Sequence, residues 1–282
     1  MNTIKNKLMD YGIWILLTLS ILLLIIALIL VYQTYDLLAE YNSFNVSQKE
    51  IIPVIGTNVT KRKEIELVAR RGDSYKKIEN FLESNNILNP GELKRYLVNE
   101  KMSLEGIVFE GSYHIPRPSS PEEVVSILTY PYKEWVETEY SKYEGIDKSP
   151  LEIITIASMI EKEAALDEER PIIAGVIYNR LNKNMKLQID ATVIYALGEH
   201  KTRLSWEDLE VNSPYNTYIV YGLPPTPICT PGSRSIEAAL NPASHSYYYY
   251  VLAGYGNSHH NFSETYEEHL KNVQVYLSSI EK

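Results

Sequence analysis

A run of twenty mostly apolar residues near the start of the chain limits its possible folds more than any other feature. Residues 13–32 read IWILLTLSILLLIIALILVY, and no charged side chain lies between Asp10 and Asp36. A helix of about 20 such residues, rising ~1.5 Å per residue, spans the ~30 Å hydrocarbon core of a bilayer. The sequence therefore predicts a transmembrane anchor over residues 12–34.

A cleaved signal peptide is the main alternative for this run. Its apolar core would be about 7–15 residues long and would end at a small-residue cleavage site. The run here is longer, and the segment that follows it, QTYDLLAEYNS, is a poor cleavage site. Lys5 and Lys7 precede the run, whereas Asp36 and Glu40 follow it, so the positive-inside rule keeps residues 1–11 in the cytoplasm. We expect a single-pass protein of the cell (inner) membrane, with its larger part extracytoplasmic or periplasmic.

The composition of the chain excludes several classes of function. The net charge is -9 and the pI is about 5.3, whereas nucleic-acid binding requires a basic face. Cys229 is the single cysteine, which rules out an intramolecular disulfide and a cysteine-based metal site. The histidines show no zinc-binding spacing. We therefore expect no metal, no other cofactor and no nucleic-acid partner.

Behind the predicted anchor, the pattern of the sequence changes twice. The first segment is polar and shows no long period, as in a tether. An alternating stretch then precedes Gly72-Asp73-Ser74 and two segments with helical spacing. This order resembles a LysM module, although a packing module without a ligand has the same pattern. The expected organisation is a cytoplasmic N-terminus 1–11, an anchor 12–34, a tether 35–62, a LysM-like subdomain 63–130 and a large domain 131–282.

The segment ASMIEKEA, residues 157–164, ends a very apolar helix in two carboxylates. Ile154, Ala157, Ser158 and Glu161 share one face of that helix, so Glu161 extends an apolar stripe. Burial lets a carboxyl group hold a proton near neutral pH, which a general acid requires. The alternative is that both glutamates only form ion pairs at the helix end.

The following segments are rich in uncharged hydrogen-bonding groups and aromatic rings, which together suit a sugar. They read NRL (179–181), LQIDATVIYALG (187–198), SPYNTYIVYGLPPTPICTPG (213–232), ALNPA (239–243) and HNFSETYEEH (260–269). With ASMIEKEA, they closely resemble the endolytic murein transglycosylases of the MltG (YceG-like) family, over about residues 64–282. At 108–113 the chain reads VFEGSY where the family often has LFPDTY, so no ligand role is assigned to that turn.

The resemblance implies an enzyme that cleaves the glycan strands of nascent peptidoglycan and terminates their elongation. Peptidoglycan synthases are then candidate partners. Glu161 matches the first Glu of the family's EKE element and would be the catalytic acid and base. Glu163 matches the second Glu and would assist it structurally or electrostatically. The substrate cleft would be lined by Glu163, Gln188, Asp190, Tyr215, Asn216 and Thr217, of which Asp190 also suits a helix N-cap.

In the implied reaction, the bond between N-acetylmuramic acid and N-acetylglucosamine breaks without water. Glu161 would protonate the leaving oxygen and then accept the proton of the muramic acid 6-hydroxyl, whose oxygen closes a 1,6-anhydro ring. A water-using glycoside hydrolase would need a second carboxylate about 5–9.5 Å away, and Glu163, Asp190, Glu207 and Asp208 are available. A third possibility is a non-catalytic peptidoglycan-binding anchor of the cell-wall synthesis machinery, in which Glu161 is dispensable.

The expected fold class is α+β, with more helix than strand. It combines an N-terminal transmembrane helix, the small LysM-like subdomain and a mixed α/β catalytic domain of YceG-like type. A serine-capped helix is expected to begin at Pro121 and a second one to cover 132–143. Further helices are expected near 150–163, 167–182, 190–197, 233–240 and 264–280, and strands at 215–220 and 247–253.

Overall fold

The structure is a computed structural model that describes residues 62–143, 145–199, 201 and 203–280. All described residues belong to one compact unit, Lys61–Lys282. The predicted anchor and almost all of the predicted tether lie outside the described residues. Among the described residues, no helix has the length and hydropathy needed to cross a bilayer.

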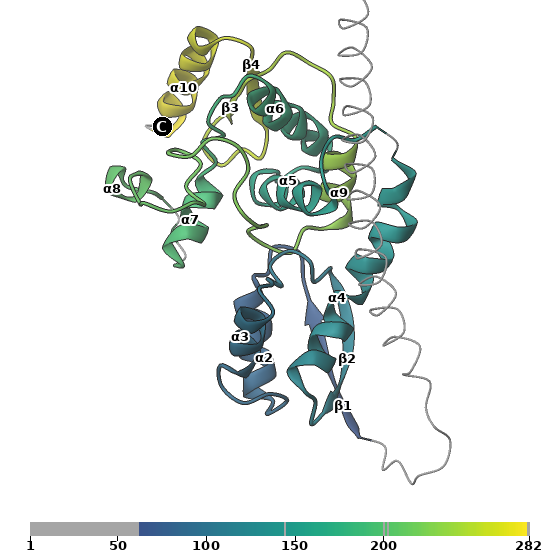
Figure 1. Cartoon of the computed structure of the whole chain (residues 1–282). Coiled ribbons are helices and arrows are strands. Elements are labelled where there is room, and N and C mark those ends of the chain that lie inside the picture. Colours follow the sequence, from purple (N-terminus) through teal and green to yellow (C-terminus); the bar gives the residue numbers. More distant parts are fainter. Residues whose placement is uncertain (1–61, 144, 200, 202, 281–282) are drawn as a thin grey trace, which may run out of the picture. The chain divides into compact units, whose positions relative to one another are not determined.

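Helices predominate over strands in the described part of the chain, as expected (Figure 1). The first half holds β1 (Lys63–Ala69), α2 (Tyr75–Ser84), α3 (Glu92–Asn99), β2 (Gly111–Arg117), α4 (Pro121–Thr138) and α5 (Pro150–Glu163). The second half holds α6 (Arg170–Asn182), α7 (Asp190–Leu197), α8 (Trp206–Leu209), α9 (Ser233–Leu240), β3 (Tyr249–Leu252), β4 (His260–Ser263) and α10 (Tyr266–Ile280). Short 3-10 turns cover Tyr140–Lys142 and Asp167–Glu169.

The first module is a two-stranded sheet packed against helices. β1 pairs with β2 in antiparallel register, so that Leu67 lies opposite Tyr113 and Ile65 lies opposite Ile115. Side chains alternate between the two faces of such a ribbon, and the inward ones are apolar. They form one core with residues from α2, α3 and α4, including Leu82, Leu93 and Leu128. The predicted strand–helix–helix order is confirmed, and β2 completes the sheet.

Helix α4 differs from the prediction because it is one helix rather than two. Ser120 caps it by accepting a hydrogen bond from the Glu123 amide at 3.2 Å. The helix continues through Pro131, which has no amide hydrogen to donate to the preceding turn. Leu128 packs in this first core. Trp135 packs against a second core, which includes Ile153, Ile156 and Ile160. Contact with both cores stabilises the continuous helix, and the expected domain boundary at residue 130 lies inside it.

Helix α5 lies at the centre of the second core, packed against α6 and α9 (Figure 1). It begins with a capping box, in which Glu152 Oε2 accepts from the Ser149 amide at 2.8 Å and Ser149 Oγ accepts from the Glu152 amide. A helix that is apolar on all sides must be buried. The largest fully buried side chains of α5 are Ile153, Ile154, Ile156, Met159 and Ile160.

Hydrogen bonds join the first module to the second core near the end of α5. The Gly72 amide donates to the Thr230 carbonyl at 2.7 Å, and the Thr230 amide donates to the Asp73 carbonyl at 2.8 Å. Lys162, near the end of α5, donates from Nζ to the Gly72 carbonyl at 2.8 Å. The turn before α2 is therefore held beside the C-terminal end of α5.

The predicted strand at 215–220 is wrong, because these residues form consecutive turns. The Asn216 side chain donates to the Leu209 and Val211 carbonyls, both at 2.9 Å, and accepts from the Tyr218 amide at 3.0 Å. Local side-chain bonds of this kind compete with pairing between strands. The other expected helices are confirmed, with residues 167–169 forming a 3-10 turn before α6, and the strand expected within 247–253 is β3.

Strands β3 and β4 form a hairpin that packs against α10. Leu252 lies opposite His260 and Tyr250 lies opposite Phe262. In an antiparallel pair, these residues and their diagonal neighbours share one face. The side chains of Tyr250 and His260 therefore point to the same side of the hairpin.

Candidate active site

A cleft of about 1450 Å³ lies in the described part of the chain. Its walls come from the start of α2, the end of α5, helix α7, the β3–β4 hairpin and α10. Three predicted site residues line it, namely Glu163, Gln188 and Asp190. The lining of this cleft does not include Glu161, Tyr215, Asn216 or Thr217.

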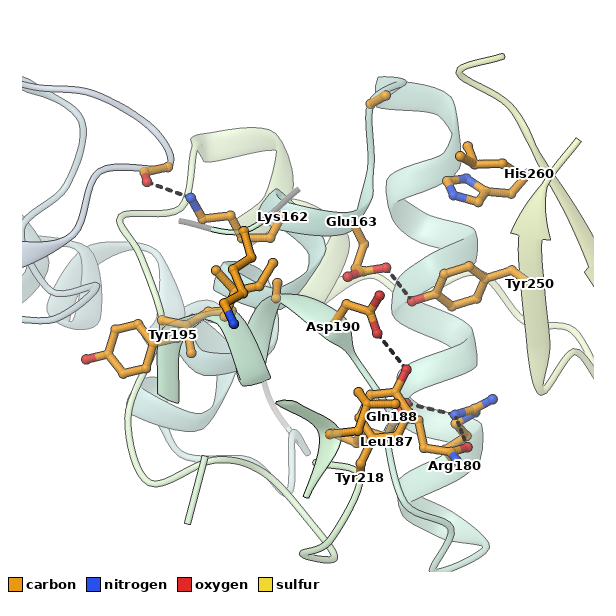
Figure 2. A pocket seen from close by; sticks show the side chains of 18 of the residues that line it. Lys162, Glu163, Arg180, Leu187, Gln188, Asp190, Tyr195, Tyr218, Tyr250 and His260 are labelled. Atoms are coloured by element: carbon orange, nitrogen blue, oxygen red, sulfur yellow. Dashed lines mark hydrogen bonds between the residues drawn. The ribbon is translucent and has the colours of Figure 1, made fainter. Parts of the chain in front are cut away.

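Glu163 is the last residue of α5, and its carboxyl group lies in the cleft (Figure 2). The Tyr250 hydroxyl, from β3, donates to Glu163 Oε2 at 3.0 Å. Burial raises the pKa of Glu163 to about 7; the hydrogen bond from Tyr250 lowers this pKa, and the negative charge of Asp190 raises it. A carboxyl group with a pKa near 7 can release a proton and take one back at neutral pH.

Asp190 lies across the cleft from Tyr250 and close to Glu163 (Figure 2). The prediction that it caps a helix is wrong, because Ile189 is the N-cap of α7 and Asp190 is the first helical residue. Its Oδ1 accepts a hydrogen bond from the Tyr218 hydroxyl at 2.6 Å. The carboxylate therefore faces the cleft and does not cap the amides of α7. Because Asp190 lies in the first turn of α7, the helix dipole still favours its negative charge.

Gln188 is held in the cleft wall by an almost buried arginine, Arg180. Arg180 Nη1 donates to the Leu187 carbonyl at 2.7 Å and to Gln188 Oε1 at 3.4 Å. Gln188 has a φ of 52°, in the left-handed region that side chains other than glycine rarely adopt. Its amide donates to the Thr217 carbonyl at 3.1 Å, so the loop before α7 is fixed on both sides.

Glu161 lies outside the cleft in a pocket of hydrogen-bond donors. Its Oε2 accepts from Ser235 Oγ at 2.7 Å, from the Gly232 amide at 3.1 Å and from Arg170 Nη1 at 3.3 Å. The side chain is 7% exposed, and that of Arg170 is 4% exposed. Charge-assisted bonds such as the one from Arg170 are stronger than neutral ones, and they hold this carboxylate in one position. Glu161 thus joins α5 to α6 and to the start of α9.

The geometry of α5 explains why Glu161 and Glu163 lie in different surroundings. Successive residues of an α-helix are rotated by about 100°, so Glu161 and Glu163 point in directions about 200° apart. The stripe of Ile154, Ala157 and Ser158 does continue to Glu161, as predicted, and it faces the interior. That interior holds α9 and Arg170, whereas the opposite side of the helix end faces the cleft.

Residues 215–217 contact residues that precede or belong to α7, one wall of the cleft. Tyr215 packs on the Tyr195 ring at 4.8 Å, and its hydroxyl bonds to Thr226 Oγ1 at 2.7 Å. Asn216 is fully buried and uses its amide to hold the backbone turns described above. Thr217 is also fully buried, and its Oγ1 accepts from the Ile189 amide at 2.9 Å. These three residues hold the loop that leads to α7 and are absent from the lining of the cleft.

Several cleft residues are not singled out by the sequence analysis. Tyr250 belongs to the YYYYVLAG stretch, where four consecutive tyrosines give no sign of which ring faces the site. Arg180 lies in the NRL motif and Tyr218 in the SPYNTYIVYG motif. Membership of these motifs is the one sequence signal that could have placed them in the cleft. Alternation along a strand indicates which tyrosines share a face with Tyr250. It does not indicate which of the two faces meets the cleft.

Glu105 is a further carboxyl group in the cleft wall and was not among the predicted site residues. The residue is 2% exposed. Its Oε1 accepts from the Tyr75 amide and its Oε2 accepts from the Tyr195 hydroxyl, both at 3.2 Å. Burial raises the pKa of Glu105 to about 7, against the opposing effects of these two bonds and of Lys162. This carboxyl links the start of α2 to α7.

Aromatic rings complete the cleft at its edges. Trp206, in α8, is 83% exposed and Tyr266, in α10, is 59% exposed, and both line the cleft. Exposed rings beside hydrogen-bonding groups offer flat apolar faces with a polar rim. Within the part of the chain that the structure describes, no three His, Cys, Asp or Glu side chains are grouped to hold a metal ion.

A family model and individual proteins of known sequence are similar to this chain. The model of the YceG-like family matches residues 34–275. An endolytic murein transglycosylase of Bacillus subtilis (strain 168) is 41% identical over 182 residues, which are 64% of this chain and 50% of that protein. A protein of the same name from Streptococcus pneumoniae serotype 2 (strain D39) is 32% identical over 181 residues, or 62% of this chain and 33% of that protein. The chain thus spans half or less of these relatives' lengths.

A solved structure is also similar to this chain. The 2.6 Å crystal structure of a yceG-like protein from Listeria monocytogenes has a TM-score of 0.60 and 32% sequence identity. The match covers 73% of this chain and 75% of that one. The mixed arrangement of helices and short strands described above is therefore shared with a protein solved by crystallography.

Proposed function

The chain belongs to the YceG-like family, as its motifs predict, and from this premise we propose that it is an endolytic murein transglycosylase acting on peptidoglycan glycan strands. The observation that carries the proposal is Glu163. Its carboxyl group has a pKa of about 7 and lies in a cleft lined by charged and uncharged hydrogen-bonding groups and by aromatic rings. Such a cleft matches the chemistry of an N-acetylated sugar chain.

In the proposed reaction, Glu163 acts first as an acid and then as a base. Protonated Glu163 gives its proton to the glycosidic oxygen between N-acetylmuramic acid and N-acetylglucosamine, and the C1–oxygen bond breaks through an oxocarbenium-like transition state. Ionised Glu163 then takes the proton of the muramic acid 6-hydroxyl as that oxygen bonds to C1. The products are a 1,6-anhydro end and a new N-acetylglucosamine hydroxyl, and Glu163 regains its proton.

The acid–base role that the sequence favours for Glu161 is assigned to Glu163 in this proposal. Glu161 Oε2 is bound by Arg170, Ser235 and the Gly232 amide, and Glu161 is absent from the lining of the cleft. Its Oε1 lies 3.9 Å from Nε of the largely exposed Arg71. Its proposed role is to hold the start of α9 against α5. The other predicted cleft residues that face the cavity, Gln188 and Asp190, are proposed to contact the sugar chain.

The experiment is a digest of purified glycan strands by the full-length protein in detergent, with the products identified by mass spectrometry. Wild type is expected to release fragments with 1,6-anhydro ends, and Glu163→Gln is expected to release none. General acid–base assistance contributes typically ~10²–10⁴-fold, so its loss is easily measured. Cleavage by Glu163→Gln at the wild-type rate would overturn the assignment, and the absence of cleavage by folded wild type would overturn the function.

A water-using glycoside hydrolase is the second candidate, and Asp190 is the observation that favours it. Its charge acts on Glu163, so the cleft holds a second carboxylate near the first. A hydrolase would use that carboxylate as a base or nucleophile. The same digest separates the two candidates, because hydrolysis leaves reducing ends and transglycosylation leaves anhydro ends.

The placement of the protein in the cell is a further part of the proposal. Residues 12–34 are proposed to anchor it in the cell membrane with residues 1–11 in the cytoplasm. The cleft would then act on nascent strands beside the peptidoglycan synthases and end their elongation, with residues 63–130 as a LysM-like subdomain. Protease added to intact protoplasts is expected to remove a C-terminal epitope, and protection of that epitope would contradict this orientation.

A further inference from the structure

Glu169 and His260 form a nearly buried contact beside the cleft that the proposed reaction does not use. Glu169 is the last residue of the 3-10 turn before α6, and its side chain is 6% exposed. Its Oε1 accepts from the His260 amide at 2.8 Å, and its Oε2 contacts His260 Nδ1 at 2.7 Å. The side chain of His260 is 8% exposed. One carboxylate therefore holds both the backbone and the ring of His260.

This contact determines what the other ring nitrogen presents. An ionised carboxylate can only accept, so Nδ1 of His260 carries the hydrogen that Glu169 binds. A partner on one ring nitrogen orients the ring and selects the tautomer. Nε2 then faces away from Glu169. Among the described residues, no hydrogen-bond partner is found for it, and His260 lines the cleft.

The position of His260 relative to the acid–base residue is also defined. Its ring meets the Tyr250 ring edge to face, with centroids 5.3 Å apart and an interplanar angle of 86°. Tyr250 in turn donates to Glu163. Figure 2 shows Tyr250 and His260 extending from the hairpin in the same direction, with the Tyr250 hydroxyl reaching Glu163. A ligand that reaches Glu163 therefore lies near His260.

We propose that His260, oriented by Glu169, is a substrate-binding residue whose Nε2 hydrogen-bonds a hydroxyl or acetamido group of the sugar next to Glu163. This inference rests on the proposed function, because it takes an N-acetylated glycan as the ligand. The competing explanation is that the Glu169–His260 contact only fastens β4 to the start of α6. The two explanations assign importance to different nitrogens of one ring.

Two substitutions separate these nitrogens. In His260→Asn, the side-chain amide reaches the position of Nδ1 and can still donate to Glu169, but nothing replaces Nε2. In His260→Gln, the amide reaches the position of Nε2, but the bond to Glu169 is lost. His259→Ala is the matched control, because His259 lies 3.7 Å from Glu169, is 62% exposed and is outside the cleft lining.

The measurement is the affinity of full-length Glu163→Gln protein for glycan strands without stem peptides, together with thermal unfolding. A neutral hydrogen bond contributes about 0.5–1.5 kcal/mol, so His260→Asn is expected to weaken binding about 2- to 12-fold while keeping the unfolding midpoint. His260→Gln is expected to show the reverse pattern, and His259→Ala to change neither quantity. Unchanged binding by a folded His260→Asn protein would overturn the inference.

A spectroscopic measurement needs no substitution at His260. With histidine labelled by ¹⁵N in the full-length Glu163→Gln protein, added strands are expected to shift the Nε2 resonance of His260 and leave those of His259 unchanged. An unchanged His260 resonance in protein saturated with strands would refute the proposed contact. The digest with wild type is run separately, so a missing cleavage activity counts against the proposed function while these binding measurements still decide the role of His260.

Discussion

The Tyr250 hydroxyl donates to Glu163 Oε2 at 3.0 Å, joining two residues that are 87 positions apart in the sequence. The bond connects the β3–β4 hairpin to the C-terminal end of α5. It stabilises the ionised carboxylate and lowers the pKa that burial raises. The hairpin therefore adjusts the proton affinity of the residue proposed to carry out the chemistry.

Replacing Tyr250 with Phe is expected to move the pH dependence of cleavage to higher pH. The phenyl ring keeps the contacts of the tyrosine ring, but the bond that lowers the pKa of Glu163 is lost. The protonated acid should then persist above the wild-type value of about 7. The measurement is kcat against pH, because this profile reports groups in the enzyme–substrate complex. Tyr255→Phe, at an exposed position outside the cleft, is the control, and a profile displaced to lower pH would contradict the prediction.

Replacing Glu161 with Gln is expected to reduce stability rather than chemistry. The substitution removes the charge that pairs with Arg170 in a nearly buried site. Arg170 keeps its ion pair with Asp167 at 2.9 Å, so the loss should be smaller than the about 3–5 kcal/mol that an unpaired buried charge costs. Thermal unfolding measures this loss. Turnover per folded molecule, measured well below the unfolding midpoint, should stay close to wild type, and a stable but inactive variant would return the acid–base role to Glu161.

Replacing Glu105 with Gln is expected to flatten the dependence of stability on pH. In the folded protein the pKa of Glu105 is raised from 4.5 to about 7, so between these values the folded state binds a proton that the unfolded state has released. The free energy of unfolding must then fall as pH rises from about 4.5 to 7, by at most about 3 kcal/mol from this group. Denaturant unfolding across this range should show a smaller fall in the variant. An equal fall in both proteins would contradict the prediction.

Replacing Asn216 with Ala is expected to destabilise the fold, whereas replacing Gln188 with Ala is expected to weaken substrate binding. Asn216 is fully buried, and its loss leaves the Leu209 and Val211 carbonyls without a donor at about 1–3 kcal/mol each. Gln188 lines the cleft. Denaturant unfolding and the KM for glycan strands measure the two effects. A large rise in KM for stable Asn216→Ala protein would restore it as a ligand-binding residue.

Local patterns were sufficient for the helices that carry their own signals. Helix α5 begins at the Ser149 capping box and is apolar on every side, so its limits and burial follow from neighbouring residues. The turns at 215–217 were missed because Asn216 satisfies backbone groups that alternation alone would assign to a strand. The unbroken helix through Pro131 was missed because two separate cores stabilise it.

The sequence by itself determined the family, the order of most elements and the pair of glutamates that ends α5. Helical periodicity also determined that Glu161 and Glu163 point in nearly opposite directions. Only the tertiary structure decided which of them lines the cleft. That choice depends on where α9, Arg170 and the β3–β4 hairpin pack around α5. These elements lie far along the chain, and no local pattern encodes the side on which each one packs.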